Sequence, residues 1–211
     1  MVWGKSRWVE STTSTSHPSP PSSLNALGEE VVRNVLALGV NLIVKLHDRS
    51  QDLREMYSGG IDWRSRLRPL MEDGRGCIAP GHDISPYLVA ADVMITDHSS
   101  AGFEYLLLDR PIVRIRRPGL LKAALVHPDY AELLASVSES VDDARGVADA
   151  TTRALADPSA RSEQRRAVAE DLFHMPGSAT ARSIAEPYDA LALEPATAVI
   201  PFEEARCQPS A

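Results

Sequence analysis

Two groups of polar side chains stand directly after apolar runs, and both could bind a small anion. One group follows Val93–Thr96 and consists of Asp97, His98, Ser99 and Ser100. The other begins with His47, which follows residues 42–46, an apolar run interrupted only by Lys45. Serine hydroxyls and histidine ring nitrogens donate hydrogen bonds to phosphate oxygens, and a helix N-terminus favours negative charge. We therefore interpret Ser99, Ser100 and His47 as candidate phosphate contacts.

The loop after residue 96 also has a structural interpretation. Ser99 and Ser100 suit the N-cap and first turn of a helix, a common place for serine. Asp97 is expected to hold the loop by accepting backbone hydrogen bonds, and His98 to support the loop or line the pocket. A nucleophilic serine is disfavoured because the chain has no Gly-x-Ser-x-Gly turn.

Glu104 and Arg116 are further candidates near the same edge. Glu104 lies about one helical turn after Ser100, where its carboxylate could accept hydrogen bonds from ribose hydroxyls. The alternative is a solvent-facing glutamate near a helix start. Arg116 follows residues 112–115, and its guanidinium could either pair with phosphate or solvate the strand end.

The elements that must position these residues form a β-α-β pattern. Val93–Thr96 and Ile112–Ile115 have the apolar, β-branched content of strands buried on both faces, and the short segment between them predicts a helix. Such units build a parallel sheet, in which ligands bind beyond the carboxyl ends of the strands. The pattern predicts an α/β fold with a Rossmann-like parallel sheet and flanking helices.

Three parts are expected along the chain. Residues 1–23 should hold a partial strand and, over Ser11–Ser23, a Ser/Thr/Pro-rich flexible loop. Residues 24–193 should form the Rossmann-like domain and 194–211 a loose tail. The predicted strands are 41–46, 77–79, 93–96 and 112–115. The predicted helices are 24–38 (closed by Gly39), 61–71, 84–91, 142–156, 159–173 and 180–193.

Composition narrows the function classes. The formal net charge is -7, with 44% hydrophobic residues. A local group of basic residues on an acidic chain indicates a small anionic ligand and not nucleic acid, which needs a broad basic face. No apolar run approaches the roughly 20 residues of a membrane helix. Cys77 and Cys207 form neither a metal motif nor a disulfide framework, so we expect a reducing compartment and no bound metal or other cofactor.

Taken together, these residues resemble the CDP-glycerol glycerophosphotransferase family, the teichoic acid primases and polymerases. The family pattern is an aspartate, a Tyr or His, two serines, and an acidic residue after an aromatic one, matched by Asp97-His98-Ser99-Ser100 and Phe103-Glu104. Lys45-Leu46-His47 resembles the family's strand-end histidine motif, with Asp48 where a proline is usual. Residues 173–182 are similar to the start of the family's last helix. The resemblance covers residues 23–193.

The resemblance implies the C-terminal domain of a GT-B fold, in which two Rossmann-like domains face each other across a cleft. It implies transfer of glycerol phosphate, or a related polyol phosphate, from a CDP donor to a cell-wall polymer or a lipid-linked acceptor, with His47 stabilising the leaving CMP. The family places a further essential histidine in the preceding domain, so this chain resembles half of an enzyme that needs an N-terminal GT-B domain on another segment. The expected location is the cytoplasm or the inner face of the cell membrane.

Two alternatives stay open. One is a UDP-sugar epimerase or glycosyltransferase of the same architecture. Such enzymes often carry a Gly-Gly pair where Ser99 and Ser100 stand, which favours the phosphotransferase. The other alternative is a non-catalytic nucleotide-binding module.

Overall fold

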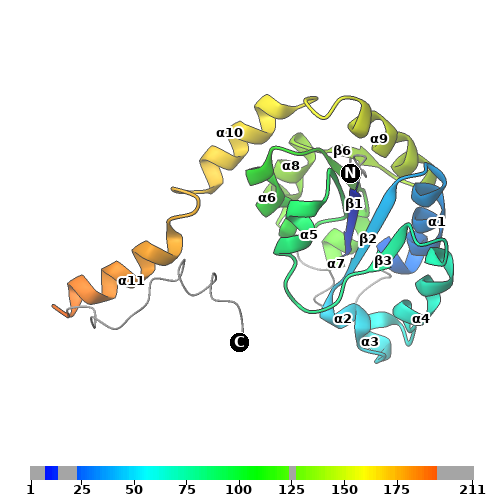
Figure 1. Cartoon of the computed structure of the whole chain (residues 1–211), viewed down its shortest axis with the longest axis horizontal. Helices are drawn as coiled ribbons and strands as arrows, with labels where there is room; N and C mark the ends of the chain where they lie inside the picture. The colour runs from blue at the N-terminus through cyan, green and yellow to red at the C-terminus, as the bar shows by residue number, and fades with distance from the viewer. Residues whose placement is uncertain (1–7, 14–22, 124–126, 194–211) are drawn as a thin grey trace, which may run out of the picture. The chain divides into compact units, whose positions relative to one another are not determined.

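The computed structural model describes residues 8–13, 23–123 and 127–193, which fall into two compact units, Met1–Leu172 and Phe173–Ala211. The first unit holds a six-stranded sheet in the order β3-β2-β1-β4-β5-β6 (Figure 1). Every neighbouring pair of strands is parallel. The strands are β1 (Trp8–Thr13), β2 (Asn41–Leu46), β3 (Gly76–Ile78), β4 (Val93–Thr96), β5 (Ile112–Ile115) and β6 (Glu139–Val141). The predicted α/β fold with a Rossmann-like parallel sheet is confirmed.

The strands differ in how clearly the sequence indicates them. β2, β4 and β5 coincide with the apolar runs, because burial on both faces requires nearly continuous apolar side chains. β1 pairs with both β2 and β4 and includes Ser11–Thr13, which were expected in a flexible loop. Backbone pairing on both sides overrides the polar composition there. Residues 14–22 of that predicted loop and the predicted tail, 194–211, lie outside the described residues.

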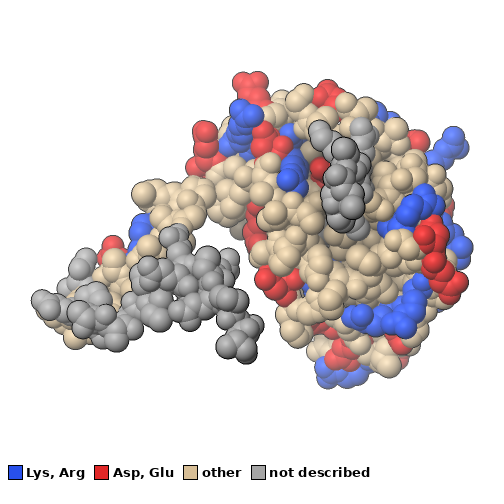
Figure 2. Space-filling view, in the orientation of Figure 1, with Lys and Arg blue, Asp and Glu red and all other residues tan. Residues whose placement is uncertain are grey.

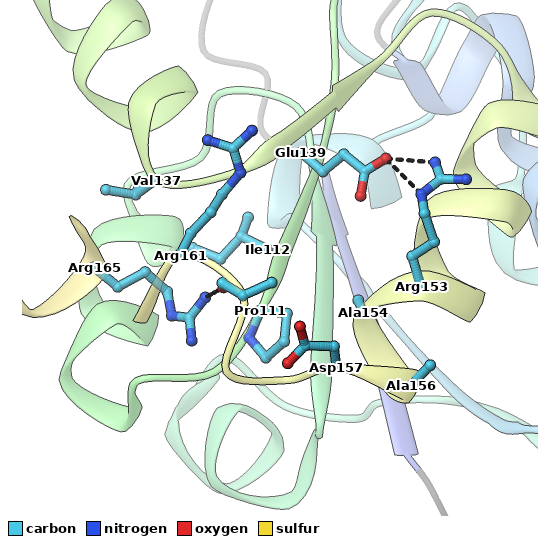
Figure 3. A pocket seen from close by; sticks show the side chains of 11 residues that line it. Pro111, Ile112, Val137, Glu139, Arg153, Ala154, Ala156, Asp157, Arg161 and Arg165 are labelled. Carbon is cyan, nitrogen blue, oxygen red and sulfur yellow. Dashed lines mark hydrogen bonds and ion pairs between the residues drawn. The ribbon is translucent and has the colours of Figure 1, made fainter. Parts of the chain in front are cut away.

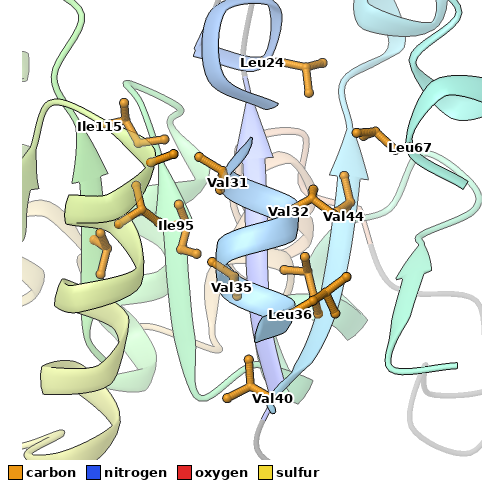
Figure 4. Packing of buried hydrophobic residues seen from close by; sticks show 14 of the residues in the cluster. Leu24, Val31, Val32, Val35, Leu36, Val40, Val44, Leu67, Ile95 and Ile115 are labelled. Atoms are coloured by element: carbon orange, nitrogen blue, oxygen red, sulfur yellow. The ribbon is translucent and has the colours of Figure 1, made fainter. Parts of the chain in front are cut away.

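One face of the sheet is covered by α1 (Ser23–Ala37) and α9 (Ala144–Ala156), with α4 (Trp63–Leu67) beside them. Their apolar side chains pack against alternate residues of β2, β4 and β5 in a single core (Figure 4). Gly39 ends α1 with φ of +75°, a conformation that glycine adopts without steric cost, as the sequence predicted. Val35, Val93 and Val113 are fully buried in this core.

The opposite face is covered by α5 (Ser85–Ala90), α6 (Ala101–Tyr105), the 3-10 turn η2 (Leu106–Leu108) and α8 (Pro128–Ser136) (Figure 1). A Cβ atom on Gly102 of α6 would lie 3.0 Å from Leu134 Cδ1 of α8 and 3.7 Å from Thr96 Cγ2. These short distances indicate that α6, α8 and β4 meet closely just below the loop of Ser99 and Ser100. A residue larger than glycine there would push on Leu134.

Shorter elements connect the strands. After β2 come α2 (Asp48–Gln51), α3 (Glu55–Ser58), α4 and the 3-10 turn η1 (Arg68–Met71), where the sequence predicted one helix over 61–71. After β5 come α7 (Pro118–Ala123) and α8, which the sequence did not predict, and β6 is a strand of three residues that it also missed. α10 (Ser162–Leu172) completes the first unit.

The second unit contains α11 (Ala179–Ala190), which has Pro187 inside it, close to the predicted helix 180–193. Arg182 Nη2 donates a hydrogen bond to the carbonyl of His174 at 2.9 Å, which ties the start of α11 to the preceding turn. The predicted limits of the domain, 24–193, stay a prediction.

Candidate functional site

Asp97, the first residue after β4, holds the loop that follows this strand. This side chain is 2% exposed, and its Oδ2 accepts a hydrogen bond from Ser23 Oγ at 2.8 Å. Its Oδ1 accepts the backbone N–H of His98 at 2.7 Å. Asp97 therefore joins the start of α1 to the end of β4, contacts that suit the structural role predicted for it.

Ser99 and Ser100 stand at the start of α6 but differ in their contacts. Ser99 Oγ accepts the N–H of Ala101 at 3.3 Å, so this hydroxyl is engaged by the backbone. Ser100 is exposed and is the N-cap residue, with no hydrogen bond from its side chain to the helix. α6 itself has five residues and continues as a 3-10 turn, so its dipole is smaller than that of a full helix. Ser100 is thus the more exposed hydroxyl of the pair, while Ser99, which only accepts in this contact, keeps its O–H to donate.

His98 has an unusual environment. Its side chain is 8% exposed, and Nδ1 is buried without a hydrogen-bond partner among the described residues. Asp97 Oδ1 lies 3.4 Å from this nitrogen, outside hydrogen-bond geometry. The predicted pocket contact of His98 stays a prediction, and the ring packs inside the loop.

His47 lies at the end of β2, directly before α2, and is exposed. Its carbonyl accepts the N–H of Ser50 at 2.9 Å, which closes a tight turn and fixes the backbone at this position. Nearby, His82 Nδ1 lies 2.9 Å from Asp48 Oδ1, and both side chains are largely exposed. His47 thus lies directly beyond a buried strand, and its role as a leaving-group contact stays a prediction.

Glu104 and Arg116 differ in whether their side chains are paired. Glu104 is exposed on α6, and its carboxylate has no hydrogen bond or ion pair to another described residue. Arg116 Nε donates to Asp142 Oδ1 at 2.8 Å, and its Nη2 contacts the other oxygen of the same carboxylate. The hydrogen bond from Arg116 lowers the pKa of Asp142, and the same bond raises the pKa of Arg116. Phosphate would have to compete with this carboxylate for Arg116.

The parallel sheet brings the predicted residues to one edge, although not to one point. His47 follows β2 and Ser99 follows β4, and β1 lies between these strands. Adjacent strands are about 4.8 Å apart, so the two strand ends are separated by about 10 Å. A ligand that contacts both must therefore be longer than a single phosphate group.

Sequence reasoning assigned no role to two buried cations at this edge. Lys45 is 6% exposed in β2, and its Nζ donates to the carbonyl of Gly81 at 2.8 Å. Arg114 is 8% exposed in β5. The available signal was a charged residue interrupting an apolar strand, visible at both positions in the sequence.

A cavity lies at the opposite end of the strands, near the starts of β5 and β6. It has a volume of 370 Å³ and is lined by the starts of β5 and β6 and by the segment between α9 and α10 (Figure 3). Arg153 and Glu139 form an ion pair on its wall. None of the predicted site residues lines it. Because parallel sheets place ligands beyond their carboxyl ends, we assign the candidate site to the other edge.

The surface in Figure 2 carries basic and acidic side chains interspersed with one another. Within residues 8–13, 23–123 and 127–193, no three His, Cys, Asp or Glu side chains gather as metal ligands. In the same part of the chain, no helix has the length and apolarity needed to span a membrane.

Solved structures with a similar fold include the wall teichoic acid polymerase TagF, with a TM-score of 0.59, 13% identity, and coverage of 92% of this chain and 46% of TagF. A glycosyltransferase from Rickettsia africae ESF-5 has a TM-score of 0.53 and 11% identity over 90% of this chain and 48% of its own. The chain thus spans less than half the length of these proteins. At such identities the likeness concerns the fold alone. No curated protein matches the chain.

A family model gives a second, independent comparison. It matches residues 33–116, a segment that contains β2, β4 and β5 and the polar residues that follow them. This segment therefore carries the sequence pattern of the CDP-glycerol:poly(glycerophosphate) glycerophosphotransferase family, which confirms the expected resemblance over residues 33–116. The similarity expected at residues 173–182 lies outside this match and stays a prediction.

Proposed function

We propose that this chain is the nucleotide-binding half of a CDP-glycerol glycerophosphotransferase-like transferase. The observation that carries the proposal is the family match over residues 33–116, since it includes both His47 and the Ser99–Ser100 pair. The fold that the chain shares with TagF supports the same assignment. The donor is CDP-glycerol or a similar CDP-polyol, and the acceptor is a polyol-phosphate polymer or a lipid-linked primer. The reaction takes place in the cytoplasm, at the inner face of the membrane.

The proposed step is displacement at phosphorus. An acceptor hydroxyl attacks the β-phosphorus of the donor, the new O–P bond forms, and the bond to CMP breaks. Protein catalysis of such a step consists mainly of positioning and charge stabilisation. On this chain, Ser100 and Ser99 contact the diphosphate, Glu104 accepts hydrogen bonds from the ribose, and His47 stabilises negative charge on the departing CMP.

We propose that the acceptor hydroxyl is activated by a residue outside the Rossmann-like domain of this chain. The resemblance assigns the base for the acceptor hydroxyl to a preceding domain, and the solved relatives are about twice as long as the chain. We therefore propose an N-terminal GT-B domain, on another segment, as the partner that completes the cleft. The open carboxyl edge of the sheet suits such an arrangement, because a nucleotide there would be covered from the other side.

Calorimetry on the chain tests the donor. CDP-glycerol should bind more tightly than UDP-GlcNAc by at least about tenfold, which corresponds to about 1.4 kcal/mol. Preference for UDP-GlcNAc would point to a UDP-sugar enzyme. Binding of CDP-glycerol without turnover, even with an N-terminal half supplied, would favour a non-catalytic module.

His47 provides the test of mechanism. In the presence of the N-terminal half, His47→Ala should lower turnover by a larger factor than it weakens CMP binding, because charge on the leaving phosphate grows in the transition state. Equal losses would reduce His47 to a binding residue.

A further inference from the structure

Arg114 lies in a row of polar side chains that crosses the sheet close to its carboxyl edge. It pairs in register with Thr96 of β4 on one side and Ser140 of β6 on the other. Val113 and Ile115 belong to the core beneath α1 and α9, so Arg114, between them, points to the opposite face of the sheet. Thr96 directly precedes the loop that contains Ser99 and Ser100. Arg114 is therefore one strand away from that loop.

The guanidinium of Arg114 uses little of its hydrogen-bonding capacity. Nε donates to Ser140 Oγ at 3.1 Å. A guanidinium has five N–H groups, and Nη1 and Nη2 of Arg114 bond to no other described residue. Neither nitrogen is one of the fully buried polar atoms without a hydrogen-bond partner. These guanidinium nitrogens are therefore not completely buried, although the residue as a whole is 8% exposed.

The charge of Arg114 is uncompensated. No carboxylate of the described residues pairs with it, whereas Arg116 is held by Asp142. Burial lowers the pKa of Arg114, and the neighbouring charge of Arg116 lowers it further. A buried cation without a counter-charge is costly, and such a cost is removed when an anion binds.

We propose that Arg114, and not Arg116, is the arginine that binds a phosphate oxygen of the nucleotide diphosphate at this edge. The identity of the ligand rests on the proposed function, while the anion-binding role rests on the geometry alone. A guanidinium with two free nitrogens can form the forked contact that phosphate favours. The register places Arg114 on the strand next to β4, about 4.8 Å from the strand that leads into the loop of Ser99 and Ser100, a spacing that a diphosphate can span.

The test is calorimetric titration of the full chain with CDP-glycerol, inorganic pyrophosphate and cytidine. Arg114→Met should weaken CDP-glycerol and pyrophosphate binding by about 10- to 100-fold, the range expected for lost hydrogen bonds to a charged group. Cytidine binding should not change. Arg114→Lys keeps the cation but loses the fork, so its affinity should be intermediate. Arg153→Met, at the opposite edge, is the matched control and should bind as the native chain does.

Several outcomes would overturn the inference. The first is that a folded Arg114→Met variant binds CDP-glycerol and pyrophosphate as tightly as the native chain. The second is that the variant loses as much affinity for cytidine as for pyrophosphate. The third is that the native chain binds neither CDP-glycerol nor pyrophosphate. If Arg114→Met does not fold, the Arg114→Lys variant tests the proposal. Unchanged pyrophosphate affinity in Arg114→Lys would refute the forked contact between the guanidinium and phosphate. Preference of the native chain for UDP-GlcNAc would refute the proposed donor, yet the pyrophosphate titration would still decide the role of Arg114.

Discussion

The described part of the chain buries two arginines, at opposite edges of the sheet, and their environments differ. Arg165 of α10 is 1% exposed, and its Nε donates to Asp109 Oδ1 at 3.0 Å. Its Nη2 donates to the carbonyls of Asp109 and Pro158 at 3.1 and 2.9 Å. Arg114 of β5 has a single hydroxyl partner. A fully bonded buried charge holds the fold together, whereas a partly bonded one near a ligand edge is available for binding.

Replacing Arg165 should have the largest effect on stability. Arg165→Met removes the contacts that join α10 to η2 and leaves the partly buried Asp109 with Arg166 and Ser162 as partners. We expect a loss of about 2 to 3 kcal/mol in the free energy of unfolding, measured by urea denaturation. Arg166→Met is the control, because Arg166 is 69% exposed and should contribute less than about 1 kcal/mol. Similar losses for both variants would contradict the assigned role of Arg165.

Lowering the pH should weaken the contacts between Asp109 and the arginines of α10. Burial raises the pKa of Asp109, but hydrogen bonds from Ser162 and Arg166 and the charge of Arg165 lower it by more, so it lies below 3.8. A carboxyl with a lowered folded pKa contributes stability above its unfolded pKa and loses it as pH falls through the folded pKa. The native chain should therefore exceed Asp109→Asn in stability at neutral pH, and the difference should shrink below about pH 4.

Denaturation of both proteins at several pH values measures this difference. Asparagine tolerates the positive φ of 49° at this position, so the variant isolates the charge. A difference that is constant down to pH 3, about one unit below the usual pKa of aspartate, would show that the charge of Asp109 does not stabilise the fold.

Replacing Arg114 should not lower the free energy of unfolding as replacing Arg165 does. Without ligand, Arg114→Met replaces an uncompensated buried cation by an apolar side chain, so the free energy of unfolding should change by less than about 1 kcal/mol or increase. With CDP-glycerol present, the native chain should gain more stability than the variant, since a ligand stabilises the state that it binds. A large loss of stability in the absence of ligand would place Arg114 with Arg165 as a structural residue.

The smallest change is expected at Asp142. Asp142→Asn removes an exposed ion pair and frees Arg116, and exposed pairs contribute little to stability. The urea midpoint should stay at its native value. If CDP-glycerol binding becomes much tighter in this variant, Arg116 is a competing phosphate contact and the contrast between Arg114 and Arg116 is weaker than we infer.

The contrast between Arg114 and Arg116 also shows how far the sequence could lead. β2, β4 and β5 were predictable because a strand buried on both faces needs a nearly continuous apolar run, and the polar residues after β2 and β4 followed from that prediction. Arg116 looked like the open arginine because it follows a strand. Its partner, Asp142, follows β6, a strand too short to be recognised, and pairing between distant segments is not visible in local pattern.

The loop of Ser99 and Ser100 illustrates a second limit. A helix start was predictable from its serines and the apolar residues that follow. The sequence did not indicate that the helix would be short or that Ser99 would be engaged by the N–H of Ala101. In the same helix, Gly102 packs closely against Leu134, which lies on a helix that the sequence did not predict. The difference between the two serines therefore required the tertiary structure.

The central place of β1 has a consequence for how the chain folds. β1 is the strand that joins β3-β2 to β4-β5-β6, and Val9 pairs with Val93. During synthesis, β1 can meet β2 early but must wait for residues 93–96 before its other edge is covered. Until then the two halves of the sheet expose unpaired edges, which are templates for association with other chains. A chain that lacks its first 13 residues would still contain β3-β2 and β4-β5-β6, but no strand would pair with the facing edges of β2 and β4. We therefore expect such a chain to aggregate.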